Sequence, residues 1–196
     1  QNACDLVAAH VIRGKGNEQV FALACRGFFL YACSNQPLGE YMTAPEIIKD
    51  LVRRFDEHID SYRSGRYNET QLRREFLDPF LEALGWDVIN KQNYAEMYKD
   101  VIHEDSLEIE GENKAPDYAF RIGGTRKFFV EAKKPAVNIE MNIHPAFQLR
   151  RYAWSAKLAL SILTDFEEFA VYDCRAKPDK ADKASTGRVK LIAYKD

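Results

Sequence analysis

The stretch APDYAFRIGGTRKFFVEAKKP, residues 115–135, constrains the fold of this chain more than any other part of it. Apolar or aromatic side chains alternate with small or charged ones over residues 118–122. A Gly-Gly pair follows, which accepts the positive φ angles of a two-residue hairpin turn. Residues 128–132 then read as the returning strand, so the pattern predicts a β-hairpin that begins near Asp117.

Acidic and basic side chains come together in this hairpin. Because side chains alternate along a strand, Glu131 and Lys133 point the same way, about 7 Å apart, while Ala132 faces away. Counting from the turn places Asp117 opposite Val130 and close enough to Glu131 to share a cation. Two carboxylates can hold Mg²⁺ at a phosphodiester while the lysine orients or helps to deprotonate the attacking water.

Two other readings of the same residues stay open at this stage. An ordinary exposed hairpin would carry a solvated glutamate and lysine with no chemistry. Lys134 is a rival for the role of Lys133, although strand parity points it to the opposite face.

Composition sets the size and the charge distribution. The chain has 196 residues, 46% hydrophobic and 30% charged, which suits one domain or one domain with an extension. Its net charge is only -2. Residues 96–117 hold eight acids against two lysines, a net -6, whereas residues 121–157 hold eight bases against two acids, a net +6. A basic half that begins at the proposed site suits a polyanion, and two solvated faces of opposite charge are the alternative.

The cysteines and the apolar runs indicate the environment of the protein. The four cysteines form no Cys-x-x-Cys pair and have no histidine at ligand spacing, so neither a zinc site nor a disulfide framework is predicted. We therefore expect a cytoplasmic location, without a membrane span. Residues 1–41 differ in character from the rest and Met42 resembles a normal start, so we interpret residues 1–41 as an extension from a mis-called start.

Hydrophobic periodicity predicts the remaining elements. Asn68 suits the cap of a helix that Gly85 ends, and Pro79 predicts a kink near Asp78. The acidic segment 90–115 is expected to be an irregular loop without chemistry. The pattern gives an α/β fold with helices over 45–63, 69–84 and 146–158, and short strands over 86–89, 99–103, 159–163, 169–172 and 189–193.

Three spaced motifs together resemble a known superfamily. The first is NETQLRREFLDPFLEALGWDV, residues 68–88; the second is Pro116-Asp117 followed after thirteen residues by Glu131-Ala132-Lys133; the third is Gln148-x-x-x-Tyr152. They resemble the PD-(D/E)-x-K nucleases, in particular the nuclease domain of type I restriction motor subunits and single-chain type II restriction-modification enzymes. The resemblance implies a restriction-endonuclease-like mixed sheet flanked by helices over residues 42–196, as the N-terminal part of a larger enzyme.

The resemblance also implies roles for individual residues. The catalytic set is Asp117, Glu131, Lys133 and Glu69, with Glu75 as a rival of Glu69 for the helical acid. The metal, Mg²⁺ or in its place Mn²⁺, is expected at Asp117, Glu131 and the carbonyl of Ala132. Contacts with DNA are expected from Gln148, Tyr152, Arg150, Arg151 and Arg73.

The implied activity is endonucleolytic cleavage of double-stranded DNA within a restriction-modification system. The 196 residues of this sequence contain no phosphate-binding Gly-x-x-x-x-Gly-Lys-Ser/Thr loop and no methyltransferase signature. Methyltransferase and specificity modules are therefore expected in the same or a partner chain. Dimerisation on DNA is expected because cutting two strands needs two sites. A non-cleaving DNA-binding or assembly domain, and a DNA repair nuclease of the same superfamily, are the alternatives.

Overall fold

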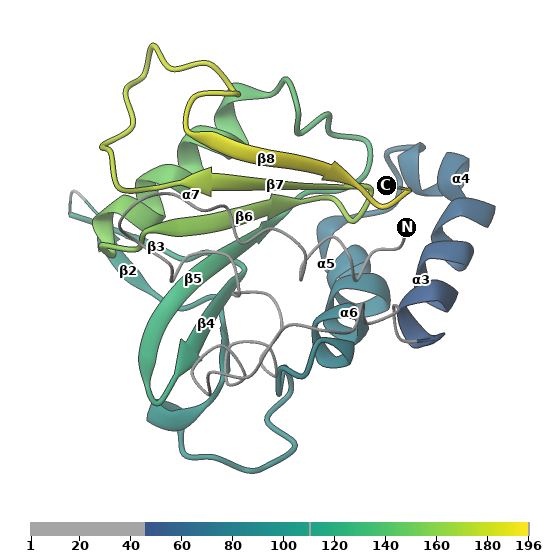
Figure 1. Ribbon diagram of the computed structural model, residues 1–196, viewed down its shortest axis with the longest axis horizontal. Coiled ribbons are helices and arrows are strands. Elements are labelled where there is room, and N and C mark those ends of the chain that lie inside the picture. The colour runs from purple at the N-terminus through teal and green to yellow at the C-terminus, as the bar shows by residue number, and fades with distance from the viewer. Residues whose placement is uncertain (1–45, 110, 196) are drawn as a thin grey trace, which may run out of the picture.

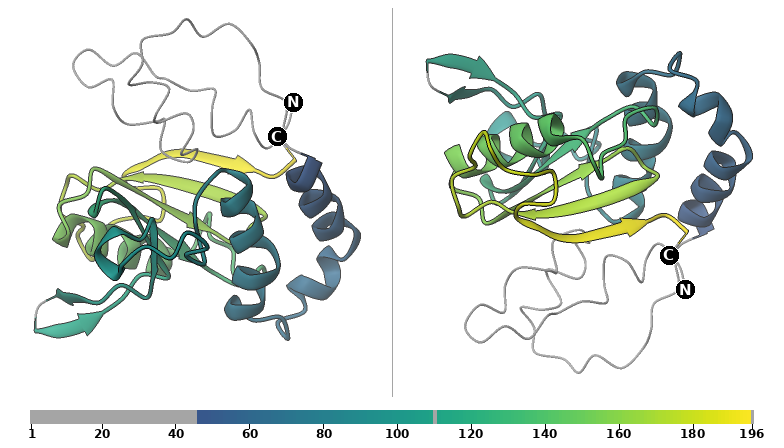
Figure 2. Two further views of the ribbon diagram at one scale, coloured as in Figure 1. Left: turned by 90° about the horizontal axis from the view of Figure 1, so that it is seen from below. Right: turned by 90° about the horizontal axis from the view of Figure 1, so that it is seen from above.

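A mixed six-stranded β-sheet is the centre of the computed structural model, which describes residues 46–109 and 111–195 (Figure 1). The strand order is β1-β4-β5-β6-β7-β8, and only β5 and β6 run parallel. A separate hairpin, β2–β3, projects from the body (Figure 2). The strands are β1 (Val101–His103), β2 (Leu107–Ile109), β3 (Glu112–Lys114), β4 (Tyr118–Ile122), β5 (Thr125–Ala132), β6 (Leu160–Thr164), β7 (Glu168–Asp173) and β8 (Arg188–Ala193).

Helices cover both faces of this sheet, which confirms the expected α/β class and the restriction-endonuclease-like arrangement (Figure 1). One layer holds the early helices and the other holds α7. The expected extension over residues 1–41 lies outside the described residues. The helices are α3 (Glu46–Glu57), α4 (Ile59–Arg63), α5 (Glu69–Leu72), the π-helix η1 (Arg73–Leu77), α6 (Asp78–Ala83), the 3₁₀ turn η2 (Glu96–Tyr98) and α7 (Ile143–Ser155).

The strand alternation divides the buried residues into two cores. Tyr118 and Phe120 of β4 pack against the early helices, whereas Ala119 between them packs on the side of α7. In β5, Phe128 faces the first core and Phe129 faces the second. Ala132 belongs to the first core, so Glu131 on the preceding position faces the layer of α7, as the period of two requires.

A π-helical turn interrupts the helix that begins after Asn68. The side chain of Asn68 accepts from Gln71 N, and the side chain of Gln71 accepts from Asn68 N, which completes a capping box. The N–H of Asp78 closes the turn η1 on the carbonyl oxygen of Arg73. The next residue, Pro79, has no N–H to donate, and its ring would collide with a carbonyl four residues back in a regular helix. The predicted kink near Asp78 therefore takes the form of this wider turn.

A β-bulge changes the register that the sequence predicts for the central hairpin. Ile122 pairs with Thr125 and Arg121 pairs with Arg126, as expected from the Gly-Gly turn. Phe120 pairs with Phe128, so Lys127 is an extra residue on β5. Val130 consequently lies opposite Tyr118, and the predicted pairing of Val130 with Asp117 is wrong by one residue.

The predicted strand over residues 86–89 is absent from this part of the chain. The Asp87 carboxylate instead accepts from the backbone N–H groups of Lys91 and Gln92, at 2.6 and 3.0 Å. Such side-chain bonds offer the backbone an alternative to strand pairing. Trp86 still packs in the core, edge-on to Phe120.

The segment 90–115 is more ordered than its sequence suggests. The predicted strand near 99–103 is present as β1, and Leu107 and Ile109 of the unpredicted β2–β3 hairpin are buried in the second core. No helix of the described ranges combines the length and apolar character that crossing a membrane requires.

Candidate active site

The central hairpin brings Asp117 and Glu131 to the same end of the sheet. The Ala132 backbone N–H donates to Asp117 Oδ2 over 2.7 Å, so the β5 strand itself holds this carboxylate. The one-residue shift from the bulge is what brings Asp117 within reach of Ala132. Lys133 follows, and its Nζ donates to Glu131 Oε1 over 2.9 Å. The three residues predicted from their spacing therefore lie together.

Glu131 is the most deeply buried acid of this group, at 3% exposed. Burial and then the negative charge of Asp117 raise the pKa of Glu131 well above its ordinary value, against the opposing effect of Lys133. Its Oε1 accepts two hydrogen bonds, from Lys133 and from Gln148. Its Oε2 is buried with no hydrogen-bond partner among the residues that the structure describes. A buried carboxylate oxygen left without a partner is costly unless a cation or a substrate completes it.

Lys133 is held as an ammonium. Burial lowers its pKa, but the carboxylates of Glu131, Glu69 and Asp117 outweigh that effect and raise the pKa above its ordinary value. Lys133 can therefore donate hydrogen bonds and stabilise negative charge, and it is poorly suited to accept a proton from water. Of the two roles considered from sequence, the environment favours orientation and charge stabilisation.

The start of α5 places Glu69 near the site and its rival Glu75 away from it. Glu69 Oε2 lies 3.8 Å from Lys133 Nζ, and its side chain is 42% exposed. Glu75 instead accepts a hydrogen bond from the hydroxyl of Tyr67 over 3.1 Å. Glu69 is thus the acid of the two that contacts the predicted catalytic set.

Arg73, for which a DNA contact is expected from sequence, lies inside the site and contacts Asp117. Its Nη1 is 3.0 Å from Asp117 Oδ1, and its guanidinium stacks over the ring of Tyr118 at 5.0 Å. Only 15% of the Arg73 side chain is exposed. The sequence spacing placed Arg73 on the face of Glu69, but it gave no sign of the partner 44 residues away.

Helix α7 adds its polar residues from the other layer. Gln148 Nε2 donates to Glu131 Oε1 over 2.8 Å, so Gln148 orients the buried acid. Tyr152, one turn later, is 6% exposed in the second core. Burial and then the charge of Glu131 raise the pKa of Tyr152.

Arg150, for which a phosphate contact is expected from sequence, is buried and does not present its charge to solvent. It is 3% exposed, and its Nη1 lies 2.7 Å from Asp182 in the loop before β8. Its neighbour Arg151 is partly buried on the same helix. The positive charge of residues 121–157 is therefore partly neutralised within the fold.

Two residues of the acidic segment belong to the site although no role was predicted for them. Glu104 Oε1 lies 3.4 Å from Arg73 Nη1, and His103 Nδ1 lies 3.3 Å from Arg73 Nη2. His103 Nε2 lies 3.1 Å from the carbonyl oxygen of Val88. The sequence signal for these contacts was the excess of acids over residues 96–117, because unpaired negative charges there need a basic partner elsewhere in the chain.

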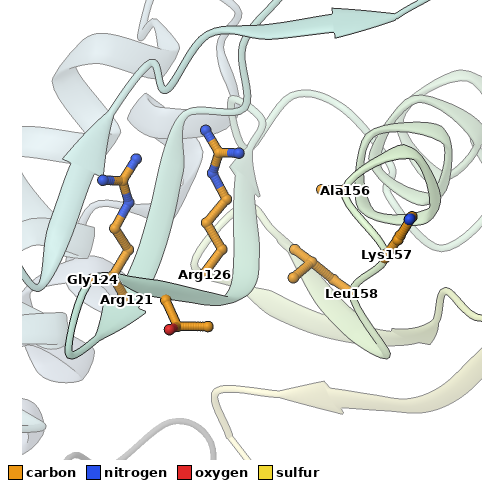
Figure 3. Close-up of a pocket in the computed structure, with 7 residues that line it drawn as sticks. Arg121, Gly124, Arg126, Ala156, Lys157 and Leu158 are labelled. Atoms are coloured by element: carbon orange, nitrogen blue, oxygen red, sulfur yellow. The ribbon is translucent and has the colours of Figure 1, made fainter. Parts of the chain in front are cut away.

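A separate cavity of about 450 Å³ lies at the turn of the central hairpin (Figure 3). Arg121 and Arg126 stand side by side on one wall, and Lys157 after α7 lies on the other (Figure 3). Both arginines are ion-paired with Asp105, at 2.8 and 2.7 Å. This cavity does not include the carboxylate pair and is distinct from the candidate active site.

The donor set at the carboxylate pair fits a hard divalent cation. Asp117 and Glu131 offer carboxylate oxygens, and Mg²⁺ is usually held by one or two carboxylates with the remaining positions left to water and phosphate. The buried, unpartnered Glu131 Oε2 is the observation that most favours a bound cation. Within the described ranges, no group of three or more His, Cys, Asp or Glu side chains has metal-holding geometry. Any cation here thus needs donors from the backbone, water or substrate.

Comparisons with known proteins relate this chain to restriction enzymes. Residues 100–180 match the family described as the type I restriction enzyme R protein N terminus. Over 155 residues, 78% of its length, the chain is 44% identical to a restriction enzyme of Escherichia coli. These two matches support a restriction-enzyme nuclease domain.

That relative is the type II restriction enzyme and methyltransferase RM.Eco57I, and the chain spans 16% of its length. No solved structure gives a significant match to the chain. The two sequence matches confirm the expected resemblance to restriction enzymes.

Proposed function

We propose that this domain hydrolyses phosphodiester bonds of double-stranded DNA in a Mg²⁺-dependent reaction within a restriction-modification system. The observation that carries the proposal is the meeting of Asp117, Glu131 and Lys133 around a buried carboxylate oxygen that has no partner among the described residues. The similarity of the chain to restriction enzymes supports it.

In this proposal, Asp117, Glu131 and the carbonyl of Ala132 hold the cation. A bound Mg²⁺ would polarise the scissile phosphate and lower the pKa of coordinated water. Gln148 and Lys133 fix Glu131 through its other oxygen. Mn²⁺ is the expected substitute for Mg²⁺.

The ammonium of Lys133 lies where negative charge develops. The oxygen of a water molecule forms a bond to phosphorus and loses a proton to the surrounding water. The bond from phosphorus to the leaving sugar oxygen breaks, and that oxygen takes up a proton from water. Lys133 orients the water and stabilises the charge on the phosphate, and Glu69 helps to hold Lys133 in place.

The rest of a longer enzyme would supply sequence recognition and methylation. The E. coli relative carries both restriction and methyltransferase functions in its name, and the chain spans a small part of it. Because each site cuts one strand, cutting both strands requires two copies on the DNA or a partner with its own site.

Cleavage of supercoiled plasmid tests the proposal. The 196-residue chain should nick or linearise the plasmid with Mg²⁺ or Mn²⁺, and a chelator should abolish cutting. Asp117→Asn and Glu131→Gln should remove activity, whereas the matched control Glu108→Gln, at an exposed position of β2, should retain it.

Cutting in the presence of the chelator, or by both site variants, would contradict the proposal. Binding of Mn²⁺ without cutting would identify a domain that cannot cleave without the rest of the enzyme. Neither cutting nor binding of Mn²⁺ would reject the metal-dependent nuclease altogether.

A further inference from the structure

Arg73 occupies the side of Asp117 that the backbone of β5 leaves open. Asp117 Oδ2 accepts from Ala132 N, whereas Oδ1 lies 3.0 Å from Arg73 Nη1. Arg73 Nη2 also lies 3.4 Å from the backbone carbonyl oxygen of Asp117. A carboxylate accepts about four hydrogen bonds in all, so the guanidinium takes positions that a cation would otherwise use.

The π-helical turn fixes Arg73 in this place. Arg73 is the first residue of η1, and its carbonyl oxygen accepts from the N–H of Asp78, which closes the turn. Both ends of the turn contact Tyr118: Arg73 stacks over its ring, and Asp78 Oδ1 accepts from its hydroxyl over 2.6 Å. Turns of this kind occur frequently at functional sites.

Each of the two acids at the centre of the site already has its own cation. Lys133 pairs with Glu131 at 2.9 Å, and Arg73 pairs with Asp117 at 3.0 Å. Each of these two ion pairs is neutral by itself without a metal. A divalent ion that approaches Asp117 is therefore repelled by a guanidinium held against the same carboxylate.

Alternative acceptors for Arg73 surround it. Glu104 Oε1 lies 3.4 Å from Arg73 Nη1. The Glu104 side chain is 71% exposed, so it can move together with the guanidinium. His103 Nε2 faces the carbonyl oxygen of Val88, which only accepts, so His103 Nδ1 is left to accept from Arg73 Nη2 at 3.3 Å. Arg73 can thus leave Asp117 without losing all its partners.

We propose that Arg73 is a positioning residue that competes with the divalent cation for Asp117, so that loading the metal requires Arg73 to move toward Glu104. The guanidinium neutralises the charge of Asp117 in the metal-free site and lowers the affinity of the site for the metal. A phosphate of DNA offers both a further metal ligand and an acceptor for the displaced guanidinium. Metal and DNA consequently bind with positive coupling. This inference rests on the proposed metal-dependent nuclease.

Titration of the 196-residue chain with Mn²⁺ in the absence of DNA tests the competition. Free Mn²⁺ is measured by electron paramagnetic resonance for wild type, Arg73→Gln and Arg74→Gln. Arg74 is the exposed neighbour in the same turn, and its removal deletes the same charge without touching Asp117. Arg73→Gln should bind Mn²⁺ at least about tenfold more tightly, and Arg74→Gln should stay within about twofold of wild type.

A second readout is the rise in melting temperature on adding Mn²⁺, which should be larger for Arg73→Gln than for wild type. If Arg73→Gln does not fold, Arg73→Lys is the second variant, because lysine keeps the charge but lacks the second terminal nitrogen of the guanidinium. The Mn²⁺ affinity of Arg73→Lys should lie between that of wild type and the tight binding expected for Arg73→Gln.

Unchanged or weaker Mn²⁺ binding in the Arg73 variants would overturn the competition, and weaker binding would show that the guanidinium orients Asp117 for the metal. Equal tightening in Arg74→Gln would also overturn it, since the effect would then be a general field of positive charge. No binding by wild type or any variant would reject the proposed function together with this inference.

Discussion

At the scale of single residues, this fold buries carboxylates under two different conditions. Glu131 is buried at the active site with one oxygen left for a ligand. Asp165, in the turn between β6 and β7, is equally buried but has a purely local partner, the N–H of Glu168 at 2.7 Å. Burial raises the pKa of Asp165 to about 7, and the charges of Glu168 and Glu167 add to the effect.

Asp165→Asn should therefore stabilise the protein in a pH-dependent way. A folded pKa above the unfolded value of about 4 means that wild type loses stability as pH rises from about 4 to 7, when the buried acid ionises. Asparagine keeps an oxygen for the Glu168 N–H but carries no charge. Urea unfolding should show a larger gain for the variant at pH 8 than at pH 5, and an equal gain at both values would contradict this account.

At the scale of elements, a single helix interrupted by a π turn supplies both Glu69 and Arg73 to the site. The capping box of Asn68 and Gln71 fixes its first turn, so the cap determines that the helix begins at Glu69. The wider turn before Pro79 then sets the direction of the following segment. The positions of Glu69 and Arg73 are thus consequences of local helix chemistry.

Asn68→Ala should destabilise the protein by about 1 kcal/mol, because the N–H of Gln71 loses its acceptor. Asn68→Asp retains an acceptor and serves as the control. The measurement is the midpoint of urea unfolding for the three proteins. A loss as large in Asn68→Asp as in Asn68→Ala would show that the cap is not the cause.

Local sequence patterns predict the helices and strands of this fold better than they predict the contacts between them. The central hairpin and α7 follow from alternation, the Gly-Gly turn and helical spacing, and Glu131 and Lys133 share a face as strand parity requires. The extra residue Lys127 was not predicted, since a bulge depends on how two strands pair. The ion pairs of Arg150 with Asp182 and of Arg73 with Asp117 were not predicted, because each pair joins residues that are distant in sequence.

At the scale of the whole molecule, the site lies where the two helical layers meet the same end of the sheet. The early helices bring Glu69 and Arg73, the central hairpin brings the two acids and the lysine, and α7 brings Gln148. The basic cavity at the hairpin turn is separate from this site (Figure 3). The site therefore forms only when both helical layers are packed correctly on the sheet.

The rate of plasmid nicking by Lys133→Ala and Lys134→Ala, with Mg²⁺, tests the central claim most directly. The two lysines are adjacent and carry the same charge, but Lys133 contacts Glu131, and the contacts of the described residues give Lys134 no such partner. Loss of the charge that stabilises the phosphate should slow Lys133→Ala by about 100-fold or more, and Lys134→Ala should stay within about threefold of wild type. Equal rates for the two variants, or a fully active Lys133→Ala, would contradict the assignment of this site as the centre of cleavage.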